Sequence, residues 1–219
     1  MKKNFEQERN VVSFISFGGV FCCIIFLTLI AVPNYWKNII YERSALTWVE
    51  SLILSACSMI SFFNFLFLKK QKGKISGIWI LLTSVFLYLA LDERFMLHEG
   101  IRERILKPNN IQLKFLFWVE KGDYVLLMFM VAGLSILPFI FKELKSDKTS
   151  MRFFITGIIF SVFAVLTYTI DLRGKQLQSQ YLIQYVEEVL ETSGMLCFFN
   201  SFTANFFKIL TGFFNEQQE

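Results

Sequence analysis

Long apolar runs separated by short charged segments make up most of the chain. Six such runs cover residues 11–32, 45–68, 75–97, 122–141, 152–170 and 186–210. Each is close to the length of about 20 residues that an α-helix needs to cross a hydrocarbon core of about 30 Å. The pattern therefore predicts an all-α membrane protein in which residues 1–219 form one bundle of about six transmembrane helices. A five-span arrangement with a half-inserted last helix stays open, because the sixth run begins with three glutamates.

The composition agrees with a membrane protein and excludes a soluble domain. Of the 219 residues, 54% are hydrophobic and only 18% are charged, and the mean hydropathy is +0.49. The first run follows a charged N-terminal segment, as in a signal peptide, but it is too long and lacks a small-residue cleavage pattern. We therefore expect it to be the first membrane helix.

The basic residues lie in short segments between the apolar runs, which is typical of topology determinants. Lys and Arg number twelve on the side of the N-terminus and ten on the other side. The two densest basic segments, residues 69–74 and 142–152, lie on the N-terminal side, and the positive-inside rule gives such short loops the most weight. The sequence thus predicts a bacterial-type inner-membrane protein with both termini in the cytoplasm. A net charge of +4, scattered over these loops, argues against a nucleic-acid partner.

The cysteines lack the spacing of a metal site or a disulfide framework. Cys22, Cys23, Cys57 and Cys197 lie within apolar runs, without a CxxC pair or a nearby histidine. We expect them to be small buried hydrophobic residues.

Small residues recur inside the predicted spans. Ser51, Ser55, Ser58 and Ser61 follow one another at helical spacing, which predicts close packing of the second span against a neighbour. Glycines within spans are expected to be contacts between helices for the same reason. They are Gly18, Gly19, Gly133, Gly157 and Gly194.

Acidic residues gather on the side opposite to the termini. The alternation of the spans places twelve of the eighteen carboxylates there. They are Glu42, Glu50, Asp92, Glu93, Glu99, Glu103, Glu120, Asp123, Asp171, Glu187, Glu188 and Glu191. Several lie inside apolar runs, such as Glu50 in the second span, where a charged side chain costs about 2.5–3.5 kcal/mol at the bilayer centre. Such residues normally face a cavity or one another, so the sequence predicts one polar pocket on the outer side.

Helical spacing brings some of these residues to common faces. If the third helix continues through residues 92–99, Asp92 and Glu99 share one face, and Arg94 and His98 share the neighbouring face. This spacing places acids and the imidazole at the outer end of the third span.

Two other segments complete the predicted pocket. The start of the sixth helix carries three acids whose spacing lets them point into the same sector of the helix surface: Glu187, Glu188 and Glu191. Residues 99–120 combine alternating Arg and Glu with an apolar-aromatic stretch, which predicts an amphipathic segment lying on the outer membrane surface. We expect this segment to cover the pocket.

Carboxylates from several helices and one imidazole are the ligand types of a carboxylate-rich metal site. Closely spaced acids cannot all ionise without a compensating cation, so a divalent metal is one way to satisfy the pocket, with calcium, manganese or iron favoured over zinc. The candidate metal ligands are Asp92, Glu99, Glu120, Asp123, Asp171, Glu187, Glu188 and Glu191. The candidate catalytic residues are Asp92, Glu93 and His98, with His98 as a general base or a ligand.

A network of ion pairs is the alternative explanation of the same acids. Arg94, Arg102 and Arg173 lie on the same side and would neutralise them at the helix ends. In that case His98 pairs with Glu93, with Glu99 or with an acid that is linked to an arginine. The sequence leaves both arrangements open.

No nucleotide-binding, acyl-hydrolase or zinc-protease motif occurs in the chain. The favoured interpretation is a non-enzymatic membrane component, acting as a sensor, scaffold or pore subunit with a protein partner or with copies of itself. A metal-dependent, hydrolase-like membrane enzyme acting on a lipid or periplasmic substrate is the first alternative. A cation or proton carrier is the second, with Asn64, Asn200 and Asn205 as a path toward the inner side.

Overall fold

The computed structural model is helical throughout its regular structure and describes residues 5–41, 43–72, 76–106, 108, 124–168 and 176–216. Residues 72, 99, 102, 106, 124–130 and 168 are described by their backbone alone. The helices are α1 (Glu6–Ile30), α2 (Ala45–Lys72), α3 (Gly77–Phe95), α4 (Leu97–Ile101), the π-helical segment η1 (Arg102–Leu106), α5 (Tyr124–Leu144), α6 (Lys148–Tyr168) and α7 (Leu177–Glu216). No strand occurs in the described ranges, and the predicted all-α class is confirmed.

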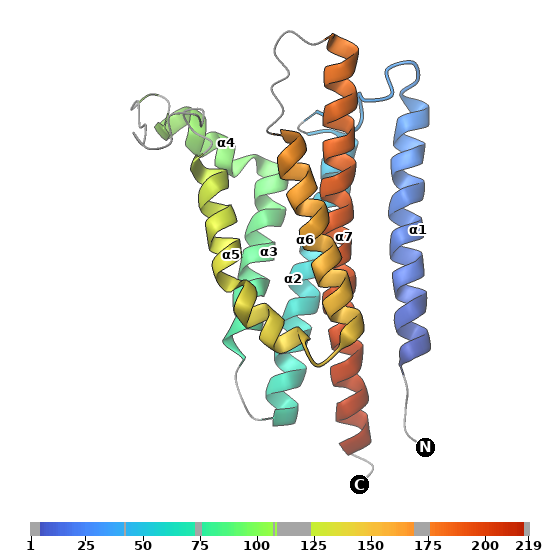
Figure 1. Ribbon diagram of the computed structural model, residues 1–219, viewed down its shortest axis with the longest axis vertical. Helices are drawn as coiled ribbons and strands as arrows, with labels where there is room; N and C mark the ends of the chain where they lie inside the picture. The colour runs from blue at the N-terminus through green and yellow to red at the C-terminus, as the bar shows by residue number, and fades with distance from the viewer. Residues whose placement is uncertain are drawn as a thin grey trace.

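The long helices run alternately up and down, and both termini lie at the same end of the bundle (Figure 1). Each of the six long helices corresponds to one of the predicted apolar runs. Within the described part of the chain, three segments are long and apolar enough to cross a membrane. They are Glu6–Ile30, Ala45–Gln71 and Lys148–Thr167.

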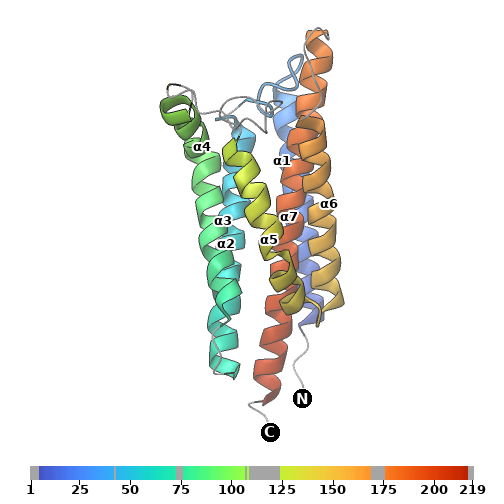
Figure 2. The same ribbon diagram turned by 60° about the vertical axis from the view of Figure 1, so that its left-hand side comes forward.

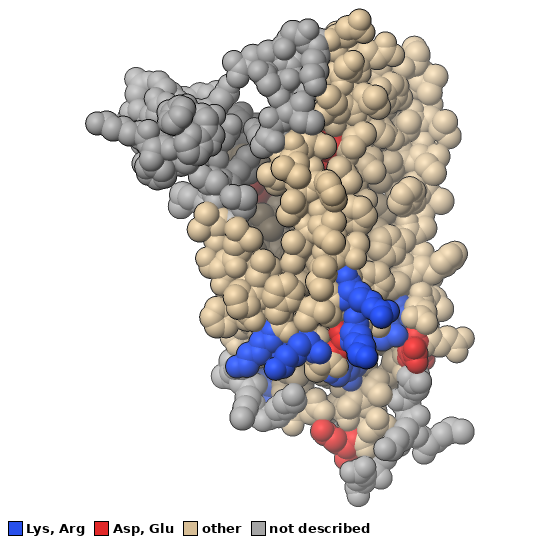
Figure 3. All heavy atoms as spheres, viewed as in Figure 1, with Lys and Arg blue, Asp and Glu red and all other residues tan. Residues whose placement is uncertain are grey.

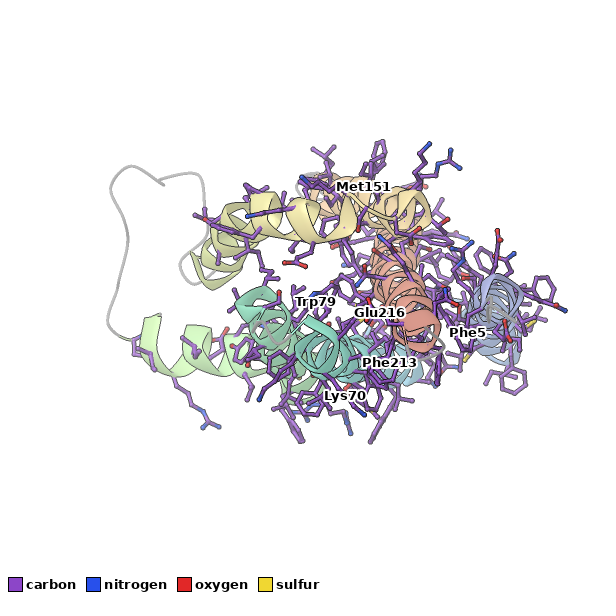
Figure 4. The ribbon with its side chains drawn as sticks, turned by 90° about the horizontal axis from the view of Figure 1, so that it is seen from below. Phe5, Lys70, Trp79, Met151, Phe213 and Glu216 are labelled. Carbon is purple, nitrogen blue, oxygen red and sulfur yellow. The ribbon has the colours of Figure 1, made fainter. Side chains whose placement is uncertain are left out.

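α7 is the central helix of the bundle. It packs along α6 and α2, and α2 packs along α3, while α5 contacts α6 and crosses in front of α7 in the view of Figure 2. Seen from the end that holds the termini, α1 stands at the edge beside α7 (Figure 4). Trp79 of α3 and Phe202 of α7 are fully buried, and their rings meet edge to face with centroids 5.6 Å apart. This contact belongs to a core that also takes buried residues from α2, α5 and α6.

Two helices begin at capping side chains. The Ser44 hydroxyl accepts hydrogen bonds from the backbone N–H groups of Leu46 and Thr47, at 3.2 and 3.4 Å, at the start of α2. At the start of α6, the Asp147 carboxylate accepts from the Thr149 and Ser150 N–H groups at 3.4 and 3.1 Å. Both caps satisfy donors that have no partner inside the helix.

α7 is longer than its apolar run. The prediction placed the sixth span at 186–210, whereas the helix has 40 residues and begins at Leu177. The added N-terminal turns pack against the connection between α1 and α2, where the Tyr181 ring stacks on Trp36 with centroids 4.4 Å apart and an interplanar angle of 14°. Aromatic contacts with a distant segment thus support a helical extension that hydropathy alone does not indicate.

Glycines let α6 and α7 approach closely. A Cβ atom built on Gly157 would lie 2.8 Å from the Phe198 ring and 3.2 Å from the Gly194 carbonyl oxygen. One built on Gly194 would lie 3.0 Å from Ser161 Oγ. The predicted role as a helix contact is confirmed for these two glycines. It is wrong for the other three, because they face open space within this chain. They are Gly18, Gly19 and Gly133.

Serines join α2 to α3, as their spacing predicts. Ser51 Oγ donates to the Ala90 carbonyl oxygen, and Ser58 Oγ donates to that of Thr83, both at 2.8 Å. Such bonds need closely spaced backbones, which small side chains permit.

The asparagines of the predicted inner path are engaged in contacts between helices. Asn64 Nδ2 donates to the Phe202 carbonyl oxygen, and Asn205 Nδ2 donates to Asn64 Oδ1, both at 3.0 Å. Asn200 Nδ2 donates to Ser16 Oγ at 3.0 Å and ties α7 to α1. Their observed hydrogen bonds hold α1, α2 and α7 together.

Candidate functional site

Glu50 lies in the second turn of α2, and its side chain is only 1% exposed. The Thr192 hydroxyl of α7 donates to its Oε1 at 2.6 Å. Among the described residues, this is the one hydrogen-bond donor that Glu50 has, and no Lys or Arg forms an ion pair with it. A buried carboxylate with a single donor is poorly compensated, because removing a charge from water costs several kcal/mol.

Three further carboxyl groups surround Glu50. The Glu93 carboxyl at the end of α3 is close enough for its charge to act on Glu50. Glu188 and Glu191 of α7 are close enough for their charges to act on it. We call Glu50, Glu93, Glu188 and Glu191 the Glu50 cluster. It joins α2, α3 and α7.

The Glu50 cluster needs a positive charge. Ionised carboxylates this close to one another repel, and a proton or a bound cation relieves that repulsion. The cluster extends from the buried Glu50 to Glu191, whose side chain is exposed. Protons and small cations can therefore reach it from outside the bundle.

Thr192 is fully buried and lies between two oxygens. Its Oγ1 is 2.6 Å from Glu50 Oε1 and 2.8 Å from the Glu188 carbonyl oxygen. A hydroxyl has one proton, so it donates fully to one of these oxygens at a time. When it donates to Glu188, the contact with Glu50 is satisfied only if Glu50 carries a proton and donates in turn.

A pair formed by Asp92 and His98 flanks the cluster. α3 ends at Met96, which adopts a left-handed conformation with φ 55° and ψ 46°, and the chain turns back on itself. The Asp92 carboxylate accepts from the His98 backbone N–H at 2.7 Å and contacts His98 Nδ1 at 2.8 Å. Because a carboxylate only accepts, Nδ1 carries the proton and Nε2 is the basic nitrogen. His98 is near enough to Glu93 and Glu191 for its charge, when protonated, to act on both.

This geometry corrects the expected shared face and gives His98 a partner. Residues 92–99 are not one continuous helix, so the face that Arg94 and His98 were expected to share does not exist. The His98 ring has a described hydrogen-bond partner in Asp92, whereas the side chain of the predicted partner Glu99 lies outside the description. The reason is the break at Met96, which swings the imidazole back toward the end of α3.

The predicted network of arginine ion pairs is not seen for Arg94. Its guanidinium stacks over the Trp48 ring, 4.0 Å from the ring centroid, in a cation–π contact. Arg9 pairs with Glu6 and His98 pairs with Asp92 among the described side chains. Arg102 and Arg173 lie outside the described side chains.

Several predicted metal ligands also lie outside the described side chains. They are Glu99, Glu120, Asp123 and Asp171. Most of the predicted covering segment 99–120 lies outside the description as well. Of the remaining ligands, Glu187 acts on Glu191 through its charge but is not among the groups that act on Glu50. The described residues contain no group of three or more His, Cys, Asp or Glu side chains arranged to hold a metal ion, and the predicted ligand set stays a prediction.

Glu50 and Thr192 were missing from the candidate site residues. Glu50 could have been chosen, because it is an acid within the apolar stretch TWVESLIL. Nothing in the sequence signals Thr192, since a threonine inside a membrane helix usually bonds to its own helix. Only the packing of α7 against α2 brings its hydroxyl to Glu50.

A comparison with protein families identifies the family of the chain. The family model described as a domain of unknown function, DUF8692, matches residues 25–205. The chain belongs to this family. The matched DUF8692 segment contains the Glu50 cluster, Thr192 and the Asp92–His98 pair, and it leaves out most of α1. No curated protein and no solved structure matches the chain.

Proposed function

We propose that this DUF8692 protein is a six-span component of a bacterial-type inner membrane, with both termini in the cytoplasm. The apolar surface of the long helices supports insertion, since large side chains such as Phe14 and Leu29 are 81% and 64% exposed. Lys and Arg gather in a band toward the end that holds the termini (Figure 3). The positive-inside rule supports a cytoplasmic location for that end.

We infer that the protein is a non-enzymatic sensor whose Glu50 cluster binds a cation on the opposite side of the membrane. The observation that carries this proposal is Glu50 itself: a fully buried carboxyl, surrounded by three others, with one described donor. A proton supplies the missing positive charge, or a metal ion does so after the carboxyl groups rearrange, because the described residues as they stand form no metal-binding group. At an effective dielectric constant near 20, two like charges 4 Å apart repel by about 4 kcal/mol, so binding a cation changes the energy of the site substantially.

Cation binding would act on the arrangement of three helices. The cluster takes its carboxyl groups from α2, α3 and α7, so an empty, fully ionised cluster pushes these helices apart. An occupied cluster holds them together. This difference is the two-state behaviour that a sensor needs in order to signal to a partner in a larger assembly.

A metal-dependent enzyme is the second candidate, and the Asp92–His98 pair favours it. An aspartate that fixes the tautomer of an imidazole is the arrangement used for general bases and for metal-ligating histidines. A lipid or periplasmic substrate would then react at the outer end of α3. Metal-dependent turnover of a phospholipid that is abolished by His98→Gln would favour this candidate.

The test of the cation proposal compares wild-type protein with Glu50→Gln in mild detergent. One arm adds Ca²⁺, Mn²⁺ or Mg²⁺ at neutral pH and measures bound metal by elemental analysis together with thermal stability. The other arm lowers the pH in the presence of a chelator and measures stability alone. Glu8→Gln, which changes an exposed acid on α1, is the matched control.

The outcomes of the two arms distinguish a metal sensor from a proton sensor. Stoichiometric metal and stabilisation that Glu50→Gln removes and Glu8→Gln keeps would identify a metal-binding sensor. Stabilisation by acid without metal, lost only in Glu50→Gln, would identify a proton sensor, because protonation relieves the repulsion between carboxylates. Neither effect in a folded wild-type protein would refute the proposal. Circular dichroism and gel filtration establish that Glu50→Gln remains folded.

A further inference from the structure

We propose that a groove at the end of the bundle that holds the termini binds the phosphate of an anionic phospholipid. We call it the basic groove and define it by the residues that line it, which are Phe5, Glu6, Arg9, Asp147, Thr149, Phe207, Lys208 and Thr211. It lies among α1, the start of α6 and α7, and its volume is about 360 Å³. That volume is within the range of about 300–1,000 Å³ typical of small-molecule sites. The Glu50 cluster lies at the opposite end, so the two proposals are independent.

Arg9 is the residue that indicates a ligand. Its Nε is buried and has no hydrogen-bond partner among the described residues. Its Nη2 reaches Glu6 Oε1 only at 3.5 Å, and the Glu6 side chain is 63% exposed. A guanidinium presents its donors in a planar fork that matches two oxygens of a phosphate. The basic groove thus contains an unsatisfied donor, Arg9 Nε, that an anion of this shape would satisfy.

The other polar groups of the groove fit the same ligand. Lys208 brings a second positive charge from α7, and the Thr149 and Thr211 hydroxyls come from α6 and α7. The groove also borders Asp147, but that carboxylate accepts the Thr149 and Ser150 N–H groups at the start of α6. Because its oxygens are engaged by the helix terminus, Asp147 repels an anion less than a free carboxylate would.

The surroundings favour a lipid over a free phosphate ion. The Phe5 and Phe207 rings lie 6.0 Å apart beside the polar groups, and Figure 4 shows Phe5 next to α7. Farther along α1, Phe14 and Ile15 are 81% and 63% exposed and offer an apolar path for an acyl chain. The groove therefore lies where a polar band meets an apolar surface, which is the depth of a headgroup in a bilayer.

The test measures lipid retained by the full-length protein. Native mass spectrometry follows binding of phosphatidylglycerol and of phosphatidylcholine to wild type and to an Arg9→Gln, Lys208→Gln double variant. The control is Lys142→Gln, Lys145→Gln, which removes the same charge from the same end but outside the groove. We expect the groove variant to lose about tenfold in affinity for phosphatidylglycerol and the control to keep it.

Three results would overturn the proposal. Equal losses in both double variants would show that the charged band attracts anionic lipid without a defined site. Equal retention of both lipids by wild type would show that the headgroup charge does not matter. The third result concerns inorganic phosphate. If it binds to wild type but not to the groove variant, and no lipid competes with it, the groove is a site for free phosphate instead. Circular dichroism establishes that both variants are folded.

Discussion

The hydrogen bond between Thr192 and Glu50 offers a direct test of how the buried carboxyl is held. Thr192→Val keeps the shape of the side chain and removes the hydroxyl that donates to Glu50 at 2.6 Å. Thr192→Ser is the matched control, because it keeps the hydroxyl and removes a methyl group. We expect Val to destabilise the protein more than Ser does.

The size of the effect follows from the contacts. A hydrogen bond to a charged group contributes about 1.5–3 kcal/mol, and valine regains about 0.8 kcal/mol by burying a methyl group at this fully buried position. The net loss in the free energy of unfolding is therefore about 1–2 kcal/mol. For a chain of 219 residues this corresponds to a decrease in Tm of about 2–8 °C.

The assay is denaturant unfolding in mild detergent, followed by circular dichroism. A double-mutant cycle with Glu50→Leu separates the bond to Glu50 from the 2.8 Å contact with the Glu188 carbonyl oxygen. In the Glu50→Leu background, Thr192→Val should cost less than about 0.5 kcal/mol. The same loss in both backgrounds, or an equal loss for serine, would refute the reasoning, because the hydroxyl would then act without Glu50.

Two further predictions concern the packing and the imidazole. Gly157→Ala places a Cβ 2.8 Å from the Phe198 ring and should cost about 1–3 kcal/mol in the free energy of unfolding, whereas Gly18→Ala, in open space, should be neutral or stabilising by up to about 1 kcal/mol. The same denaturant titration measures both, and equal losses would contradict the packing argument. The neutral His98 imidazole should carry its proton on Nδ1, and Asp92→Asn, whose amide donates, should move the proton to Nε2. NMR of the labelled ring nitrogens of this single histidine measures the tautomer, and an unchanged tautomer would show that Asp92 does not set it.

The sequence predicted the long helices because hydrophobic length is a local property. Each apolar run is long enough to form a helix by itself, and the start and end of a run fix the helix to within a few residues. α7 is the exception: its first turns are held by Tyr181 on Trp36, a contact between distant segments that no local pattern contains.

The candidate site was predicted only in part. The gathering of acids opposite to the termini was predicted from the alternation of spans, and the structure places Glu93, Glu188 and Glu191 close enough for their charges to act on Glu50. Helical spacing failed for His98, because one left-handed residue, Met96, redirects the chain. No periodicity argument can anticipate such a break, since methionine rarely adopts that conformation.

The sequence by itself determined the class of the protein, the helices and the end of the bundle at which acids collect, because these depend on hydrophobicity and charge along the chain. Only the tertiary structure decided that Glu50 is the centre of the cluster, that Thr192 is its donor and that Asp92 holds His98. The basic groove likewise exists only where α1, α6 and α7 meet. The physical reason is that hydrogen bonds and compensating charges act over a few ångströms, so the partner of a buried polar group is set by which helices touch.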